Sequence, residues 1–314
     1  MNIGILSTSS IAPRFIAAVR EEGSFQITAL SSRSQEKAEE KARAWNIPKA
    51  YGSHEALLAD TQVQIVYISA VNSAHYKWAK AALEHGKHVI CEKPCTTTEK
   101  QTRELFALAK EKGLFLMEAQ KMLFLPAVQA VKQAIDDGKL GTVRMAEFNH
   151  SFYGSYNNWM YDEAAGGGPL LSSAIYVIEL LQYLFGCEIA QIDGICTKHP
   201  GTNVEEQYTL SGRMENGVLF SLKNSTVALM KNGACFYGEK GYAELPDYWK
   251  ARKVIFCDHT SEEVEQFPCD HELVYEVAHI ADCFRKGLLE SPVVTGEFSA
   301  RAIRILESIK ENWN

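Results

Sequence analysis

Short apolar runs alternate with amphipathic stretches over the first 120 residues of the chain. Runs such as 2–6 and 88–91 have the length of a buried strand, and stretches such as 11–22 and 99–112 repeat apolar positions at helical spacing. Further strands are expected at 25–30, 65–70 and 114–117, and further helices at 34–45, 54–59 and 73–85. Strands that alternate with helices predict a parallel, doubly wound α/β sheet.

The remainder of the chain has a different pattern, in which alternating apolar and polar positions dominate. Strands are expected at 143–152, 189–197, 206–214, 218–226, 233–237 and 253–257, and helices at 126–137, 169–185, 271–286 and 297–313. Asn216 and Gly217 separate two of these strands and form a strong hairpin signal. This half therefore predicts an α+β domain with a large, mainly antiparallel sheet.

The length of the chain predicts two domains. At 314 residues it exceeds what one hydrophobic core usually serves. We expect a dinucleotide-binding domain over 1–121 and a substrate and dimerisation domain over 122–314, whose last helix packs back on the first domain.

Composition excludes some partners. The net charge is −7, which argues against nucleic acid as the main partner. No apolar run approaches the ~18 residues of a membrane span, and no leader sequence precedes the first strand, so we expect a cytoplasmic protein without a membrane partner. The eight cysteines are scattered without a Cys-x-x-Cys pair, which predicts reduced thiols and no metal site.

A lysine follows the strand at 88–91. The sequence there is Glu92-Lys93-Pro94, and Asn72 and His75 follow the preceding strand. Ligands bind at the carboxyl ends of parallel strands, so these residues are candidates for a site. Two alternatives are that Lys93 is paired with Glu92 or solvated, and that His75 packs at a helix N-terminus.

Glycines and a tyrosine mark a second candidate segment. Gly166-Gly-Gly-Pro leads into an apolar helix that carries Ser172, Ala174 and Tyr176. Together with Glu92-Lys93-Pro94, this pattern resembles the glucose–fructose oxidoreductase/inositol dehydrogenase (GFO/IDH/MocA) family, nearest its dihydrodiol dehydrogenase branch. The alternatives are that Tyr176 is a core aromatic and that the glycines form a flexible linker.

The resemblance implies an enzyme with a Rossmann-type first domain. Such an enzyme is an NAD(P)-dependent oxidoreductase that moves hydride between nicotinamide and a carbonyl or secondary alcohol of a sugar, polyol or cyclic diol. Lys93 would polarise the oxygen, and Tyr176 would donate or accept the proton. The resemblance also implies a homodimer formed through an open-faced sheet in the second domain. A substrate would contact Lys93, Tyr153, Trp159, Ser172 and Tyr176.

Several positions depart from the family pattern. Serines stand at 7 and 9 where glycines are expected, Val71 replaces a proline, Leu123 replaces a polar residue, and Ser172 and Ala174 replace an aspartate and a glycine. These departures motivate the alternative of a non-catalytic sensor that binds nucleotide or sugar on the same scaffold.

The turn after the first strand is the expected phosphate loop, because a helix N-terminus favours phosphate. The alternative is a plain Ser/Thr helix cap. After the second strand, Ser31-Ser32-Arg33 offers no carboxylate for a ribose hydroxyl, and arginine suits a 2′-phosphate. We therefore expect NADP(H), with NAD(H) possible because the arginine can also stack on adenine. The expected cofactor residues are Ser7, Thr8, Ser9, Ser10, Ile11, Ser32, Arg33, Ala70, Asn72, His75, Glu92 and Lys93.

Overall fold

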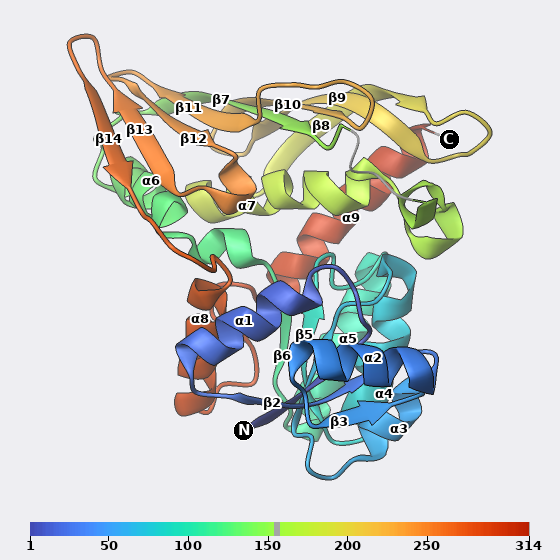
Figure 1. Ribbon diagram of the computed structural model, residues 1–314. Coiled ribbons are helices and arrows are strands. Elements are labelled where there is room, and N and C mark those ends of the chain that lie inside the picture. Colours follow the sequence, from blue (N-terminus) through green and yellow to red (C-terminus); the bar gives the residue numbers. More distant parts are fainter. Residues whose placement is uncertain (154–157, 314) are drawn as a thin grey trace. The chain divides into compact units, whose positions relative to one another are not determined.

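The structure is a computed structural model that describes residues 1–153 and 158–313. The chain divides into two compact units, of which the first comprises 1–120 and 271–303 and the second 121–270 and 304–314 (Figure 1). Residues 271–303 are expected in the second domain from the sequence, whereas the structure groups them with the first unit.

The first unit contains a parallel sheet with the strand order β3-β2-β1-β4-β5-β6. The strands are β1 (Asn2–Leu6), β2 (Gln26–Ser31), β3 (Lys49–Tyr51), β4 (Ile65–Ile68), β5 (His88–Glu92) and β6 (Leu116–Ala119). The helices are α1 (Ala12–Glu22), α2 (Gln35–Trp45), α3 (His54–Ala59), α4 (His75–Glu84), α5 (Glu99–Lys112), α8 (Val274–Arg285) and the first part of α9 (Gly296–Trp313). This confirms the predicted doubly wound sheet.

Both faces of this sheet are covered, which explains why its strands read as continuous apolar runs. Phe15 of α1 stacks on Tyr67 of β4 with ring centroids 3.7 Å apart. Leu57 of α3 and Leu105 of α5 belong to a second buried layer that also contains Leu6, Val66 and Val89.

Local signals set the helix limits in this unit. The Ser34 hydroxyl caps α2 by accepting the N–H of Lys37 at 3.2 Å, and Asn46 ends α2 in the left-handed region with φ 51°. Thr98 caps α5 in the same manner, and Gly113 ends it with φ 66°. These caps satisfy backbone groups that have no partner inside the helix.

The second unit contains a sheet with the strand order β14-β13-β12-β11-β7-β10-β9-β8. The strands are β7 (Val143–Ser151), β8 (Ile189–Lys198), β9 (Glu205–Met214), β10 (Leu219–Ser225), β11 (Gly233–Gly238), β12 (Tyr242–Pro246), β13 (Lys253–Cys257) and β14 (Glu262–Gln266). Every pair is antiparallel except β7 with β10, so the sheet is mainly antiparallel as predicted. Gly217, with φ 90°, lies in the turn between β9 and β10, which confirms the predicted hairpin.

Helices cover one face of this second sheet. Figure 1 shows α6 (Pro126–Asp136) and α7 (Ile175–Phe185) on the same side. Side chains that point toward them, such as Phe148, Leu210 and Phe236, are buried. Among the described residues of this unit, no helix covers the opposite face.

The helix expected over 169–185 is composite. A π-helical segment, Leu170–Ala174, precedes α7. The helical stretch 163–185 is long and apolar enough to cross a membrane by length and composition, which corrects the expectation that no run approaches that size. Its most apolar window is 89% buried inside the protein, as for the core helix of a folded domain.

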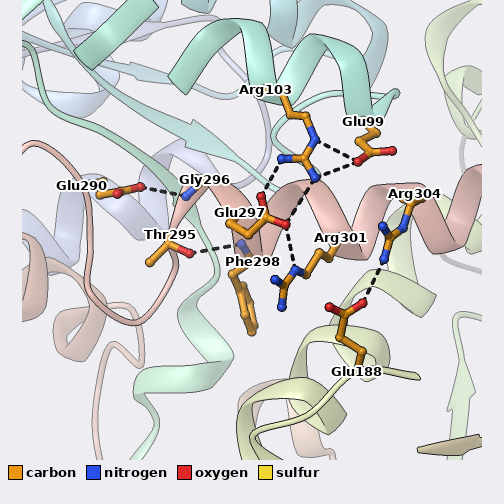
Figure 2. Close-up of polar contacts among 10 residues, drawn as sticks. All are labelled: Glu99, Arg103, Glu188, Glu290, Thr295, Gly296, Glu297, Phe298, Arg301 and Arg304. Atoms are coloured by element: carbon orange, nitrogen blue, oxygen red, sulfur yellow. Dashed lines mark hydrogen bonds and ion pairs between the residues drawn. The ribbon is translucent and has the colours of Figure 1, made fainter. Parts of the chain in front are cut away.

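Helix α9 contributes to both units, with Gly296–Ile303 in the first and the following residues in the second. At its start, Glu290 accepts the N–H of Gly296 at 2.8 Å, and Arg103 of α5 forms ion pairs with Glu99 and Glu297 (Figure 2). Further along, Arg304 pairs with Glu188 at 2.9 Å. Side-chain contacts therefore fix each part of α9 to its own unit.

Candidate active site

The carboxyl ends of β1, β2, β4 and β5 share one edge of the parallel sheet, because parallel strands end on the same side. Neighbouring ends are joined directly, since Ser7 N–H donates to the Ser31 carbonyl and Ser69 N–H donates to the Leu6 carbonyl, both at 3.2 Å. All the predicted cofactor residues follow these four strands or end them. The sheet therefore brings the residues that were predicted from the sequence to one edge, and α/β folds bind ligands at this edge.

Ser7 adopts a backbone conformation that glycine usually provides. Its φ is +87°, in the left-handed region, where a side chain costs about 1 kcal/mol or more. Serine at this position therefore keeps the loop shape that the glycine pattern would give.

The loop after β1 presents polar groups to the start of α1. The Ser9 Oγ is buried and makes no hydrogen bond within 1–153 or 158–313. Ile11 occupies the N-cap of α1 without a side-chain cap, and the first turn contains no acidic residue. The N-terminal N–H groups and an unused buried hydroxyl fit a phosphate group of a dinucleotide. This arrangement disfavours the alternative of a plain Ser/Thr cap.

At the end of β2, the Ser31 hydroxyl already has a hydrogen-bond partner within the protein. The Ser31 Oγ is 2.8 Å from Nδ1 of His54, whereas Ser32 is buried and Arg33 is exposed. Burial is the main cause that lowers the pKa of His54, and the Arg33 charge lowers it further. No acidic side chain follows β2 before α2, so a guanidinium is the charged group at this position.

Three hydrogen bonds fix the loop that carries Lys93. The Tyr67 hydroxyl donates to Glu92 at 2.6 Å, His75 Nδ1 lies 2.8 Å from the Pro94 carbonyl, and Cys95 N–H donates to Glu118 at 3.0 Å. The Lys93–Pro94 peptide bond is cis. Lys93 itself is half-buried, between Glu92 and Pro94, which both take part in these hydrogen bonds.

His75 joins two of the loops at this edge. It is buried, and its other ring nitrogen, Nε2, lies 3.0 Å from the Ala70 carbonyl. Burial is the first cause that lowers the pKa of His75, while its two carbonyl neighbours oppose that shift. Its contacts support the alternative of a packed histidine at a helix start, and this histidine positions the Lys93 loop.

The glycine run in the second unit is a packed turn, so the alternative of a flexible linker was wrong. The N–H groups of Gly167 and Gly168 donate to the carbonyls of Asp162 and Met160 at 2.9 and 2.8 Å. A Cβ at Gly167 would lie 2.5 Å from the Met160 oxygen, and one at Gly168 would lie 2.3 Å from a Glu205 oxygen. Side chains are therefore excluded from both positions.

Ser172 and Tyr176 follow this turn in the second unit, whereas Lys93 belongs to the first. The Ser172 Oγ donates back to the Gly168 carbonyl at 2.9 Å. Tyr176 is buried with 7% of its surface exposed, and Glu179, one helical turn later, is fully buried. A phenol and a carboxylate thus share one face of a buried helix.

Tyr153 and Trp159, which are predicted to contact a substrate, lie on either side of residues 154–157. Those four residues are outside the described residues. Tyr153 is 60% exposed, and Trp159 lies in a short 3₁₀ turn, Asn158–Tyr161. Leu123, where the family often has a polar residue, is fully buried in another 3₁₀ turn, Lys121–Phe124.

Sequence reasoning missed two residues that shape this edge. Glu118, fully buried at the end of β6, holds the backbone of Cys95, and His54 contacts Ser31 from α3. A carboxylate at the end of an otherwise apolar strand was an available signal for Glu118. No pattern near His54 pointed to its contact with Ser31.

Comparison with protein families gives two matches. A model described as "Oxidoreductase family, NAD-binding Rossmann fold" (GFO_IDH_MocA) matches residues 1–120, and one described as the GFO/IDH/MocA C-terminal domain matches 128–244. The trans-1,2-dihydrobenzene-1,2-diol dehydrogenase of Mus musculus is 32% identical over 98% of this chain and 95% of its own. The Homo sapiens enzyme of that name is 30% identical with the same coverage.

Solved structures share this fold. The 3-ketoreductase KijD10 from Actinomadura kijaniata, in complex with NADP and TDP-benzene, has a TM-score of 0.89 and 23% identity, covering 100% of this chain and 98% of its own. Levoglucosan dehydrogenase, in complex with NADH and levoglucosan, has a TM-score of 0.89 and 19% identity, covering 99% and 96%. At these identities the likeness concerns the fold.

Proposed function

Because the chain belongs to the GFO/IDH/MocA oxidoreductase family, we propose that it transfers hydride between a nicotinamide cofactor and a carbonyl or secondary alcohol of a sugar, polyol or cyclic diol. The observation that carries this proposal is the full-length similarity to trans-1,2-dihydrobenzene-1,2-diol dehydrogenases. Among the three substrate classes, it favours the cyclic diol. The bound dinucleotide would supply or accept the hydride.

The residues at the edge of the parallel sheet would hold that dinucleotide. Ser7 to Ile11 would bind the phosphates at the start of α1, and Ser32 and Arg33 would bind the adenosine ribose. Asn72 and His75 would shape the nicotinamide side. We propose a preference for NADP(H), because Arg33 is the charged group after β2 and a guanidinium pairs well with phosphate.

Lys93 and Tyr176 would perform the polar part of the reaction. The Lys93 ammonium would bind the substrate oxygen and stabilise negative charge on it as hydride leaves or arrives at the adjacent carbon. Tyr176 would exchange the proton of that oxygen. Ser172, Tyr153 and Trp159 would contact the rest of the substrate.

Cofactor titration tests the first step of this function. Arg33→Ala should weaken NADPH binding about tenfold or more and leave NADH binding unchanged, since a charge-assisted hydrogen bond contributes about 1.5–3 kcal/mol. Nicotinamide fluorescence gives both dissociation constants. Arg43→Ala, an exposed arginine in the last turn of α2, is the matched control. Tighter binding of NADH than NADPH by the unmodified protein would overturn the cofactor preference, and binding of neither would overturn the function.

Turnover tests the second step, with trans-1,2-dihydrobenzene-1,2-diol and NADP⁺ as the first pair. Formation of NADPH would support the proposal. A protein that binds cofactor but reduces it with none of a panel of diols, polyols and sugars would instead support the sensor alternative. The departures at Ser172 and Leu123 motivate that alternative.

We also propose a cytoplasmic homodimer formed through the uncovered face of the eight-stranded sheet. Met145 and Leu219 are cross-strand neighbours on that face and are 43% and 48% exposed, while Ile195 and Val264 are 78% and 44% exposed. Sedimentation should give a molar mass about twice the 35.1 kDa of one chain, and Leu219→Glu should lower it. A monomer at micromolar concentration would contradict this assembly.

A further inference from the structure

A buried carboxylate lies against the turn that precedes the Tyr176 helix. Glu205 is the first residue of β9 and is 5% exposed. Its Oε1 accepts the N–H of Leu170 at 2.7 Å, and Leu170 begins the helical segment that carries Ser172 and Tyr176. Glu205 therefore caps this helical segment from a distant strand.

The turn is shaped around this carboxylate. Gly168 has φ +110°, and a Cβ there would lie 2.3 Å from Oε1 of Glu205, so only glycine leaves space for the acceptor. Tyr208, on the same strand, donates its hydroxyl to the Pro169 carbonyl at 3.4 Å. Two side chains of β9 thus hold Pro169 and Leu170 by hydrogen bonds.

Hydrogen bonds connect the Gly168 turn to Ser172, which precedes the proposed proton donor by four residues. Both the N–H and the Oγ of Ser172 donate to the Gly168 carbonyl, at 3.2 and 2.9 Å. Tyr176 follows four residues later on the same buried helix. A shift of the Gly168 turn would therefore move Ser172 and change the start of the helix from which Tyr176 projects.

The surroundings of Glu205 raise the pKa of its carboxyl. Burial is the first cause that raises the pKa of this carboxyl, and Glu163 raises it further, whereas the Leu170 N–H and Lys310 lower it. Cys196 of β8 also faces it. When the pKa of an acid is raised in the folded state, the free energy of unfolding of the protein falls as the pH rises from the unfolded pKa toward the folded pKa.

We propose that Glu205 is a positioning residue, whose carboxylate fixes the Gly168–Leu170 turn so that Tyr176 is held in the geometry that proton transfer requires. This inference rests on the proposed oxidoreductase function. It adds a residue from β9, outside the glycine run and the Lys93 loop, to the determinants of the reaction.

The test compares two substitutions of Glu205. Glu205→Ala removes the acceptor, so kcat should fall about 10- to 100-fold, as expected for a displacement of about 1 Å. The Kd for NADPH should stay within about twofold, because the proposed cofactor residues belong to the first unit, and the KM for the diol should change less than kcat. Glu205→Gln keeps an oxygen at Oε1 and should restore kcat to within about threefold.

Hydrogen exchange supplies a readout that does not depend on turnover. The backbone amides of 169–176 should exchange faster in Glu205→Ala than in Glu205→Gln, and those of the first unit should not change. Glu188→Gln is the matched control, since it removes a carboxylate just beyond the other end of α7, where it pairs with Arg304. This control should retain wild-type kcat and exchange in 169–176.

Each outcome decides the proposal. A Glu205→Ala protein with unchanged kcat, or with unchanged exchange in 169–176, would overturn it. If Glu205→Ala does not fold, Glu205→Asp makes the same comparison, because it keeps the charge but withdraws the carboxylate by one methylene group. Absence of turnover in the unmodified protein would overturn the proposed function and the catalytic part of this inference. The exchange data would still show whether Glu205 holds the turn.

Discussion

Lys93→Met should lower kcat about a thousandfold while the Kd for NADPH stays within about twofold. Methionine has similar length and apolar volume but cannot donate to the substrate oxygen or offset its charge. Since Tyr67 binds the Glu92 side chain and His75 and Glu118 bind the backbone of Pro94 and Cys95, the substitution should leave the loop in place. Steady-state kinetics with the diol and fluorescence titration with NADPH measure the two quantities.

A surface lysine provides the control for this substitution. Lys112→Met, in the last turn of α5, removes an exposed charge of the same kind and should leave kcat and Kd unchanged. If Lys93→Met retains more than about a tenth of wild-type kcat, Lys93 does not stabilise the reacting oxygen. If the unmodified protein has no turnover to lose, the sensor alternative gains support.

Tyr176→Phe should lower kcat about 100-fold or more, because it removes the hydroxyl that would exchange the proton. The ring is 7% exposed, so phenylalanine keeps the packing of α7 and the melting temperature should change little. The KM should change less than kcat, since the hydroxyl acts mainly in the transition state.

Tyr183→Phe is the matched control for the tyrosine. Tyr183 lies on the same helix, and its hydroxyl donates to Gln129 at 2.9 Å. This variant should keep wild-type kcat. Equal losses in both variants would show that the effect of Tyr176→Phe comes from a disturbed helix, and the proton-transfer role would then be wrong.

Local patterns predicted much of the fold. The strands of the first unit are apolar on both faces, and the helices predicted at 34–45 and 99–112 correspond to α2 and α5, which Ser34 and Thr98 cap. The prediction missed β12 and β14, which lie toward one end of the second sheet in its strand order. β14 consists largely of charged residues with low strand propensity, so only its pairing with β13 makes it a strand.

Some features depend on contacts that no local pattern contains. The π-helical segment before α7 and the parallel pairing of β10 with β7 follow from how distant segments pack. The position of the Lys93 loop was predictable because the Glu92-Lys93-Pro94 motif directly follows the apolar run of β5, and strand ends of a parallel sheet lie at one edge. Glu205 was not, because 35 residues separate it from Leu170, whose N–H it binds.

The discontinuity of the first unit has a consequence for biosynthesis. Phe284 of α8 packs on Phe25, His88 and Phe115, and Leu116 N–H donates to the Leu289 carbonyl at 3.0 Å. A ribosome that adds about 5–20 residues per second needs roughly 8 to 30 seconds to make residues 121–270. During that interval the nascent parallel sheet lacks α8, and the aromatic surface that Phe284 will cover remains accessible to chaperones or to other chains.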